Sequence, residues 1–485
     1  MTDGTLILAV LLIPLVGAGL MAFVGRRPNV RDGLMLVVAS IEFLTVIELA
    51  RRFATTGLDP VTWARVAPGL TIGFSAEPLG LLFALIASGL WIVTGAYGIG
   101  YMRGHQEKDQ TRFFACFALA ISFAVGIALS ANLFTLFIFY EALTLSTYPL
   151  VTHHRDAKAR AGGRVYLGVL MSTSIGLFLL GIVWTYSITG TLEFSPGGIL
   201  AGNCDGRTAG ILLALFAFGT GKAALMPFHR WLPAAMVAPT PVSALLHAVA
   251  VVKAGVFTVL KIAVYIFGID FLRETGSSQW LTYVAGFTII AASIVALSKN
   301  NLKARLAYST ISQLAYIVLA AALATPAAIL GGGMHIAMHA FGKITLFFCA
   351  GAIYVTAHKT EISDMRGLGR QMPITMTAFL IGALSIIGLP PLGGSWSKWF
   401  LMLGAADADQ WLFVGVFMVS SLLNIAYLMP IAIRGFFPGD GSSRPAVKEG
   451  PWFCVVPLSL TALGSLVLFF YADELYRWLL PLVSS

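Results

Sequence analysis

The sequence is poor in charge. Only 11% of its 485 residues are Asp, Glu, Lys or Arg, whereas soluble domains carry about 25%. Cysteine is scarce too, and its few positions are scattered without the spacing of a metal site or a disulfide framework: Cys116, Cys204, Cys349 and Cys454. The low charge excludes an ordinary soluble protein. Nothing in the cysteine pattern supports zinc or an iron–sulfur cluster, so we expect no metal and no cofactor.

Apolar runs near 20 residues recur from end to end, and 58% of the residues are hydrophobic. About 20 apolar residues are needed for a membrane-spanning helix, whereas a β-barrel would show short alternating segments instead. We therefore predict an all-α polytopic membrane protein in one membrane domain, 1–485. About 14 transmembrane helices are expected, starting near Leu6, Gly33, Pro78, Phe114, Asn132, Gly163, Gly210, Val242, Leu281, Lys303, Ala327, Pro373, Trp411 and Trp452.

The net charge of +9 does not indicate a nucleic-acid partner, because the basic residues sit in short loops between apolar runs. One alternating set of loops holds 20 Lys and Arg, and the other set holds 6. Basic loops stay in the cytoplasm. We predict a bacterial cytoplasmic (inner) membrane protein with both termini on the outer side and the lipid bilayer as its surroundings.

Two consecutive spans between Ile211 and Phe257 are interrupted. Each carries a Lys in its middle, Lys222 and Lys253, and the turn between them is rich in proline. A charge at that depth costs roughly 2.5–3.5 kcal/mol, and broken helices at that depth survive only where they face protein or a water-filled cavity. The run therefore indicates a polar pathway.

A second interrupted pair follows. His335, His339 and Lys343 are four residues apart and share one helix face, and Lys398 follows a break at Pro390–Gly394. The broken-helix pattern thus returns after five spans. Because five is odd, the two units would be inverted in the membrane, as in transporters.

Glu141 lies about nine residues into its span, roughly 14 Å deep. No cation on the same helix is within reach, so its partner must come from another span, and Lys222 is the best candidate. The pair could be purely structural. The three other buried Lys and the His residues, including His247, favour a functional reading, because amines and imidazoles in apolar surroundings can exchange protons.

Each residue also has a plainer interpretation. A Lys near a helix end can extend its amine to the interface, which applies most to Lys261 and next to Lys398. A buried His can merely donate a hydrogen bond, and a metal site is disfavoured because no carboxylate or Cys shares that face. Glu48 is expected to pair with Arg51 or Arg52. Glu42 has no local partner and meets either a neighbouring subunit, the option we favour, or a second polar pathway.

These residues give the chain a resemblance to the antiporter-like membrane subunits of respiratory complex I, and most closely to the D-type subunit of the Mrp-type sodium/proton antiporters. The resemblance covers nearly the whole chain. Besides Glu141, it rests on FGTGKAALMPFHRWLPAAMVAPTPVSALLHAVAVVKAGVF, YSTISQLAYI, MHAFGKITLFF and IGLPPLGGSWSKWF. The D-type subunit is favoured by Lys398 at the terminal site and by an end without a long lateral helix.

The resemblance implies three N-terminal spans (1–112), two inverted five-helix repeats (113–267 and 280–437), and a last span with a short helix (452–485). It also implies a hydrated proton path along the membrane midplane. In that path Glu141 and Lys222 are the coupling pair, Lys398 is the terminal site, and the central relay comprises Lys253, His247, His335, His339 and Lys343.

The leading hypothesis is a proton-translocating subunit of a multisubunit Na⁺/proton antiporter, with other membrane subunits as partners. It would not be an enzyme and would hold no redox centre. The alternative is a proton-pumping subunit of a complex I-like or membrane-bound hydrogenase complex. A scaffold without transport would gain nothing from the buried charges.

Overall fold

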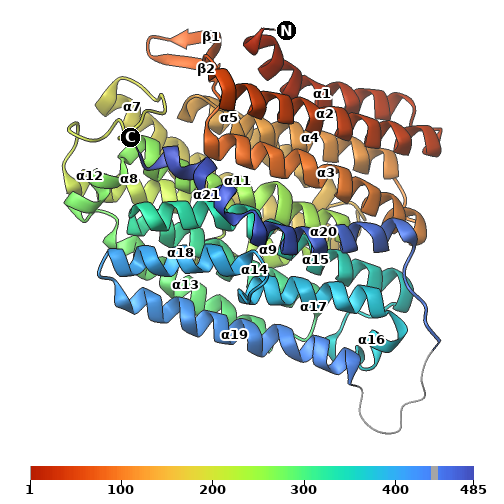
Figure 1. The fold of residues 1–485 in the computed structure, drawn as a ribbon. Coiled ribbons are helices and arrows are strands. Elements are labelled where there is room, and N and C mark those ends of the chain that lie inside the picture. Colours follow the sequence, from red (N-terminus) through yellow and green to blue (C-terminus); the bar gives the residue numbers. More distant parts are fainter. Residues whose placement is uncertain (1, 438–445, 485) are drawn as a thin grey trace.

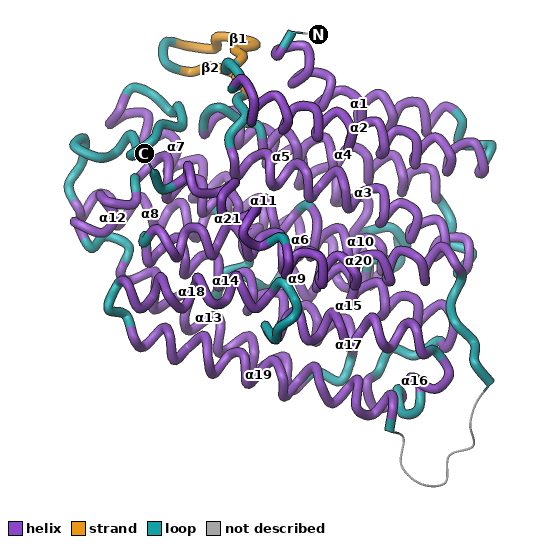
Figure 2. The backbone as a smooth tube through the Cα atoms, in the orientation of Figure 1, coloured by secondary structure: helices purple, strands orange, loops and turns teal. Residues whose placement is uncertain are grey.

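The computed structural model describes residues 2–437 and 446–484, apart from the side chains of Leu246 and His247. Most helices run side by side in one bundle (Figures 1 and 2). Within the described ranges, 11 helices are long and apolar enough to cross a membrane. They are α1 (Asp3–Phe23), α2 (Pro28–Thr56), α3 (Pro78–Gly104), α4 (Gln110–Ala128), α5 (Leu133–Val151), α6 (Ala157–Thr173) continued by α7 (Leu179–Thr189), α13 (Gln279–Ser298), α14 (Leu302–Leu323), α15 (Pro326–Ala357), α19 (Trp411–Phe436) and α20 (Trp452–Phe470).

The remaining helices are short or interrupted. A twelfth span results if α11 (Val251–Ile262), its continuation to Phe267 and α12 (Ile269–Thr275) are taken together across a 78° bend. Two apolar helices fall below the usual spanning length: α8 (Gly206–Gly219) and α17 (Pro373–Ile387). The polytopic helical fold is therefore confirmed, and the predicted count of 14 is approximate. The other short helices are α9 (Trp231–Ala234), α10 (Thr240–Ala244), α16 (Leu368–Gln371), α18 (Gly394–Asp407) and α21 (Ala472–Leu479).

Local sequence explains where the helices begin. Proline, which cannot donate a backbone hydrogen bond, occupies the first turn of α2, α3, α15 and α17. Asn132 caps α5 by accepting from the Thr135 N–H at 2.8 Å, and Asn301 caps α14 by accepting from the Ala304 N–H at 3.1 Å. These caps satisfy amides that have no partner within the helix.

The caps of α5 and α14 belong to a motif that occurs once in each half of the chain. The Asn132 amide donates to Glu193 Oε1 at 3.1 Å, and the Asn301 amide donates to Glu361 Oε1 at 2.9 Å. In both cases the Glu follows the next long helical segment. The two motifs lie at opposite ends of the bundle, because Asn132 adjoins the hairpin described next and Asn301 lines a cavity beside His154.

A β-hairpin covers the first of these ends. Strands β1 (Val61–Ala67) and β2 (Leu70–Phe74) pair antiparallel around a turn at Pro68–Gly69. Thr71 on β2 accepts from the Asn132 amide through its carbonyl at 3.1 Å. These two strands are an addition to the all-α expectation.

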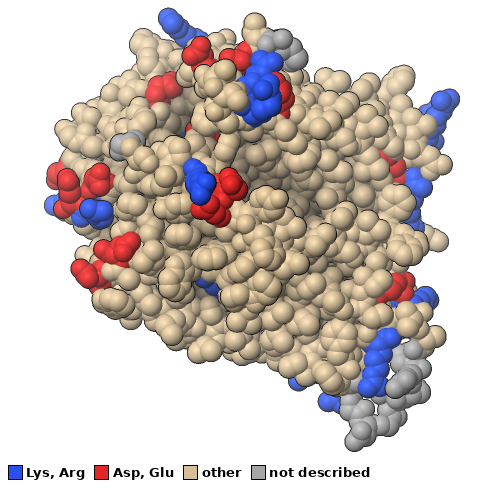
Figure 3. Space-filling view, viewed as in Figure 1, with Lys and Arg blue, Asp and Glu red and all other residues tan. Residues whose placement is uncertain are grey.

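Helices α14 and α15 form the centre of the bundle. In the apolar stretch of each, 94% of the residues are buried, against 33% in α2 and α19 at the periphery. Polar side chains on α14 and α15 are therefore surrounded by protein. On the face shown in Figure 3, charged side chains gather toward the ends of the bundle and over α21, the predicted short C-terminal helix, whose Asp473 and Arg477 are exposed.

Candidate functional site

Lys222 lies in a break between helices. After α8 ends at Gly219, the chain makes a single 3-10 turn, Gly221–Ala223, that contains the buried Lys222. Its amine donates to the Tyr140 carbonyl at 2.8 Å and to Thr144 Oγ1 at 2.5 Å, and it lies 3.2 Å from the centre of the Tyr140 ring. The predicted break is present, and the lysine within it is buried.

Glu141 and Lys222 interact electrostatically, as the predicted pairing requires, but among the described residues they form no direct ion pair or hydrogen bond. Tyr140 and Thr144 are four residues apart and face Lys222 together, whereas Glu141 projects about 100° around the same helix. Its two carboxylate oxygens are buried and have no hydrogen-bond partner among the described residues. The two groups thus lie at the same turn of α5 and interact electrostatically without forming a hydrogen bond.

A glycine brings α11 against the Lys222 turn. A Cβ atom on Gly255 would lie 2.3 Å from the Ala223 nitrogen and 2.3 Å from the Lys222 carbonyl carbon. Any other residue would push the two segments apart. Lys253 is two residues earlier on α11 and is also fully buried. It lies about 200° around the helix from Gly255, so its side chain projects away from the Lys222 turn.

From Lys253 a chain of polar side chains leads to Lys398. The Lys253 amine lies 2.7 Å from His339 Nδ1, and the rings of His339 and His335 are 5.6 Å apart. His335 Nδ1 lies 2.9 Å from the hydroxyl of Ser397, the neighbour of Lys398. Tyr316 stacks on His335 at 5.5 Å, and its ring centre is 5.2 Å from the Lys398 amine.

Lys398 follows a second break. Helix α17 ends at Ile387 and α18 begins at Gly394. The Lys398 amine donates to Ser421 Oγ at 3.1 Å and to the Ile387 carbonyl at 2.9 Å, one of the carbonyls that the end of a helix leaves without a helical partner. With an exposure of 4%, this lysine does not extend to the interface.

Lys343 forms a side branch, although it shares a face of α15 with the two His residues. Its amine turns toward α14, where it donates to Ser309 Oγ at 2.6 Å and to the Leu306 carbonyl at 3.4 Å. Ser309 in turn lies 2.8 Å from the Tyr427 hydroxyl, which donates to Asn424. His247 was predicted as a relay residue as well, but its side chain lies outside the described part of the chain.

Lys261 is not an interface residue. It is 1% exposed, and its amine lies 3.0 Å from Glu77 Oε1 and 2.9 Å from the Ser130 carbonyl that it donates to. Glu77 was not predicted from the sequence, where Glu141 and Glu42 were the expected buried carboxylates. It lies just before α3, outside the apolar runs.

Glu42 is fully buried inside this chain, on the face of α2 that packs on α1 and α3. Both of its oxygens lack a hydrogen-bond partner in the described ranges. This position contradicts the favoured expectation that Glu42 meets a neighbouring subunit. Glu48 pairs with Arg51 at 2.7 Å and with Arg52 at 2.9 Å, as predicted.

Several groups that connect the predicted residues were not singled out from the sequence. Ser309 and Tyr316 are seven residues apart on one face of α14, and both lie within the YSTISQLAYI motif. Ser397 directly precedes Lys398. Polar residues at helical spacing in an apolar run would have indicated them.

These contacts define the class of protein to which the chain belongs. The chain is a polytopic membrane protein whose interior carries a line of amines, imidazoles and hydroxyls capable of exchanging protons by short steps. The transmembrane family described as NADH:quinone oxidoreductase/Mrp antiporter matches residues 130–424, and the chain belongs to it.

Two sequence relatives agree with this assignment. The chain is 32% identical over 422 residues to NADH-quinone oxidoreductase subunit N of Desulforudis audaxviator, with 80% of this chain and 81% of the relative covered. It is 30% identical over 499 residues to NADH-quinone oxidoreductase subunit L of Mycobacterium tuberculosis, covering 98% and 76%.

Two solved complexes contain chains of the same fold. One is the membrane-bound sulfane sulfur reductase, an archaeal respiratory membrane complex (TM-score 0.85, 24% identity, 98% of this chain and 97% of that chain). The other is the Mrp complex of Dietzia sp. DQ12-45-1b (TM-score 0.84, 21% identity, 100% and 97%). At these identities the likeness establishes the fold.

Proposed function

We propose that this chain is a proton-translocating subunit of a multisubunit cation/proton antiporter, with Na⁺ as the exchanged cation and without redox chemistry of its own. The observation that carries the proposal is the line Lys253–His339–His335–Ser397–Lys398 on and beside the two most enclosed helices. Buried amines and imidazoles are costly in a membrane protein, and where they occur they mark ion pathways and proton relays.

Lys222 and Glu141 act as the switch in this scheme. In the structure, the Lys222 amine donates hydrogen bonds to Tyr140 and Thr144, and the Glu141 carboxylate accepts no hydrogen bond from the described residues. A second rotamer of Lys222 toward Glu141 would favour its charged form, because an opposite charge stabilises an ammonium. Moving between the two positions would take up and release a proton next to α11.

A proton released there passes to Lys253 and along the two histidines to Lys398. The membrane potential, at about 2.3 kcal/mol per charge per 100 mV, and the ion gradients supply the driving force. The Na⁺ site belongs, in this proposal, to another subunit of the complex, because the buried carboxylates among the described residues are isolated from one another or paired with a basic side chain.

We further propose that 113–267 and 280–437 are inverted repeats, with both termini on the outer side of the bacterial cytoplasmic membrane. The Asn–Glu motifs at opposite ends of the bundle and the two breaks beside Lys222 and Lys398 support the repeats. Basic residues are concentrated in the loops at the end of the bundle opposite the β-hairpin, and this supports the proposed orientation.

The test uses the whole operon in an antiporter-deficient strain. Lys222→Ala and Glu141→Ala should each abolish Na⁺-driven proton movement in everted vesicles and Na⁺-resistant growth, while the complex still assembles. Lys448→Ala, which removes an exposed lysine, is the matched control. Wild-type exchange in both core variants would refute the mechanism.

The second candidate function is proton pumping within a redox-driven complex. It is favoured by the sequence relatives named above, which are subunits of NADH-quinone oxidoreductases. Genes for hydrogenase or NADH-oxidising subunits beside this one, together with Na⁺-independent proton pumping, would favour it over the antiporter.

A further inference from the structure

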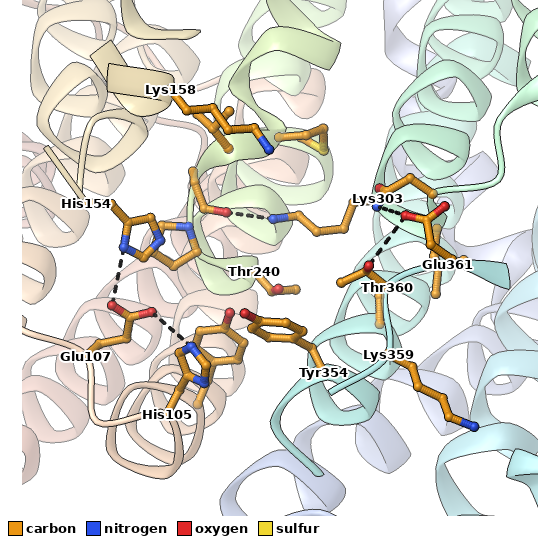
Figure 4. A pocket seen from close by; sticks show the side chains of 18 of the residues that line it. His105, Glu107, His154, Lys158, Thr240, Lys303, Tyr354, Lys359, Thr360 and Glu361 are labelled. Carbon is orange, nitrogen blue, oxygen red and sulfur yellow. Dashed lines mark hydrogen bonds and ion pairs between the residues drawn. The ribbon is translucent and has the colours of Figure 1, made fainter. Parts of the chain in front are cut away.

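A polar cavity opens at the end of the bundle opposite the hairpin. Its volume is about 580 Å³, and its walls come from the ends of α3, α14 and α15, the start of α10, and the loops after α3, α5 and α15. Figure 4 shows Glu107, His105 and His154 on one wall and Lys303 extending from the other. The relay described above uses none of these residues.

Three imidazoles surround one carboxylate on the first wall. Glu107 Oε2 lies 3.5 Å from His154 Nδ1 and 4.0 Å from His153 Nε2, and Glu107 Oε1 lies 4.0 Å from His105 Nε2. The Glu107 side chain is only 9% exposed. The residues come from two loops far apart in the sequence, so the cluster exists only in the folded protein. We call these four residues the Glu107 cluster.

The three histidines are not equivalent. Burial, helped by the charge of Arg112 and by His154, lowers the pKa of His153 to about 4. His153 is therefore neutral at physiological pH. His105 and His154 are more exposed, with side chains 30% and 36% accessible, so water reaches both imidazoles beside the Glu107 carboxylate.

The opposite wall of the cavity leads to the relay. Lys303 donates to the Ala238 carbonyl at 2.6 Å, and it lies one helical turn before Leu306, whose carbonyl accepts from Lys343. On α15, Ala350 and Tyr354 line the cavity and share a face with Lys343, seven and eleven residues away. Ala350, on the cavity wall, is thus about 10 Å along the helix axis from the Lys343 position.

We infer that the Glu107 cluster is the proton-loading site of this subunit and that the cavity delivers its protons to Lys303 and Lys343. This inference rests on the proposed function. A proton taken from water by His105 or His154 is held beside Glu107, leaves to water in the cavity, and restores the neutral imidazole. Other charged groups near the cluster are Arg112 and Asp109 beside His153, and Asp156 and Lys158 on the cavity wall.

A loading site matters when free protons are scarce. With encounter rates on the order of 10⁹–10¹⁰ M⁻¹s⁻¹, free protons at about pH 9 arrive at one site roughly 1–10 times per second. Typical turnover is about 10 s⁻¹. Near pH 6 the supply is a thousandfold larger, so removal of the cluster should slow only alkaline transport.

The experiment compares Na⁺-driven proton movement by the assembled complex in everted vesicles, where the cavity end faces the medium. Glu107→Gln should match the wild type near pH 6 and be at least about fivefold slower near pH 9, and a high concentration of the impermeant buffer HEPES should restore the rate. Glu274→Gln, which removes an exposed carboxylate on α12 that is not among the cavity-lining residues, is the matched control and should follow the wild type at both pH values.

Identical pH profiles for Glu107→Gln and the wild type would overturn the inference, as would an equal loss at both pH values or a loss that buffer does not restore. If Glu107→Gln does not assemble, the double variant His105→Gln/His154→Gln is held to the same expectations. Failure of the proposed function is distinct, because it would show as a wild-type rate in Lys222→Ala at every pH.

Discussion

Replacement of His339 by Gln tests whether protons pass along the interior of the bundle. His339 is the link between the Lys253 amine, 2.7 Å from its Nδ1, and the ring of His335, 5.6 Å away. A glutamine can keep a hydrogen bond to Lys253 but cannot gain or lose a proton at neutral pH. The change therefore removes proton exchange and leaves the packing nearly intact.

The size of the effect follows from the geometry. Without His339, the next titratable ring seen from Lys253 is His335, about 8 Å away if the two separations are aligned, whereas proton transfer needs direct hydrogen-bond contact or one bridging water. A positioned acid–base group contributes about 10²–10⁴-fold, so transport should fall by at least about 100-fold. The loss of stability should stay near 1 kcal/mol, the net value of one hydrogen bond.

The assay is Na⁺-driven proton movement in everted vesicles, normalised to the amount of assembled complex. His358→Asn is the control, because His358 caps the same helix in an exposed position with a positive φ that Asn tolerates. A His339→Gln complex that transports within a few-fold of the wild type would refute the relay as drawn.

Three further changes test a close helix contact, a buried histidine and a buried ion pair. Gly255→Ala should destabilise the complex by about 1–3 kcal/mol, seen as a lower melting temperature, because the new Cβ would lie 2.3 Å from a backbone nitrogen; Gly168→Ala, with open space around it, should not. Burial lowers the pKa of His153 to about 4, so as the pH falls the unfolded chain binds a proton at this residue before the folded protein does. The free energy of unfolding should therefore fall by up to about 3 kcal/mol between about pH 6.5 and about pH 4. His153→Gln should remove this part of the pH dependence, and an unchanged pH dependence would contradict the assignment. Lys261→Met should lower the free energy of unfolding by about 3–5 kcal/mol, because it leaves the Glu77 carboxylate without its basic partner, and adding Glu77→Gln should recover most of the loss. Equal melting temperatures for the single and double variants would show that the ion pair does not stabilise the protein.

The sequence was sufficient to predict the features that depend on residues close together in the chain. Apolar runs predicted the spans, and Pro and Gly beside Lys222 and Lys398 predicted the breaks, because each depends on neighbours in the chain. The direction of a side chain depends on how helices rotate against one another. For that reason Glu141 and Lys222 interact without the direct ion pair that was predicted. Lys343 likewise points to α14, although it shares a helix face with His339.

Buried charged residues outside the apolar runs were also missed from the sequence. Glu77 and Glu107 lie in loops, where a carboxylate is ordinarily solvated, and only the fold brings Lys261 to the first and three histidines to the second. Glu42 was placed at a subunit contact because the sequence offered no partner for it, yet tertiary packing buries it within the chain.

The length of α15 has a consequence for what the family can vary. Its 32 residues form one uninterrupted rod of about 48 Å, longer than the roughly 30 Å hydrocarbon core. The rod carries the two histidines, Lys343 and the cavity wall on shared faces. Inserting a single residue after Lys343 would turn Tyr354 about 100° away from the cavity, so insertions and deletions should be confined to the loops, and this helix should keep a fixed residue count wherever the same device is used.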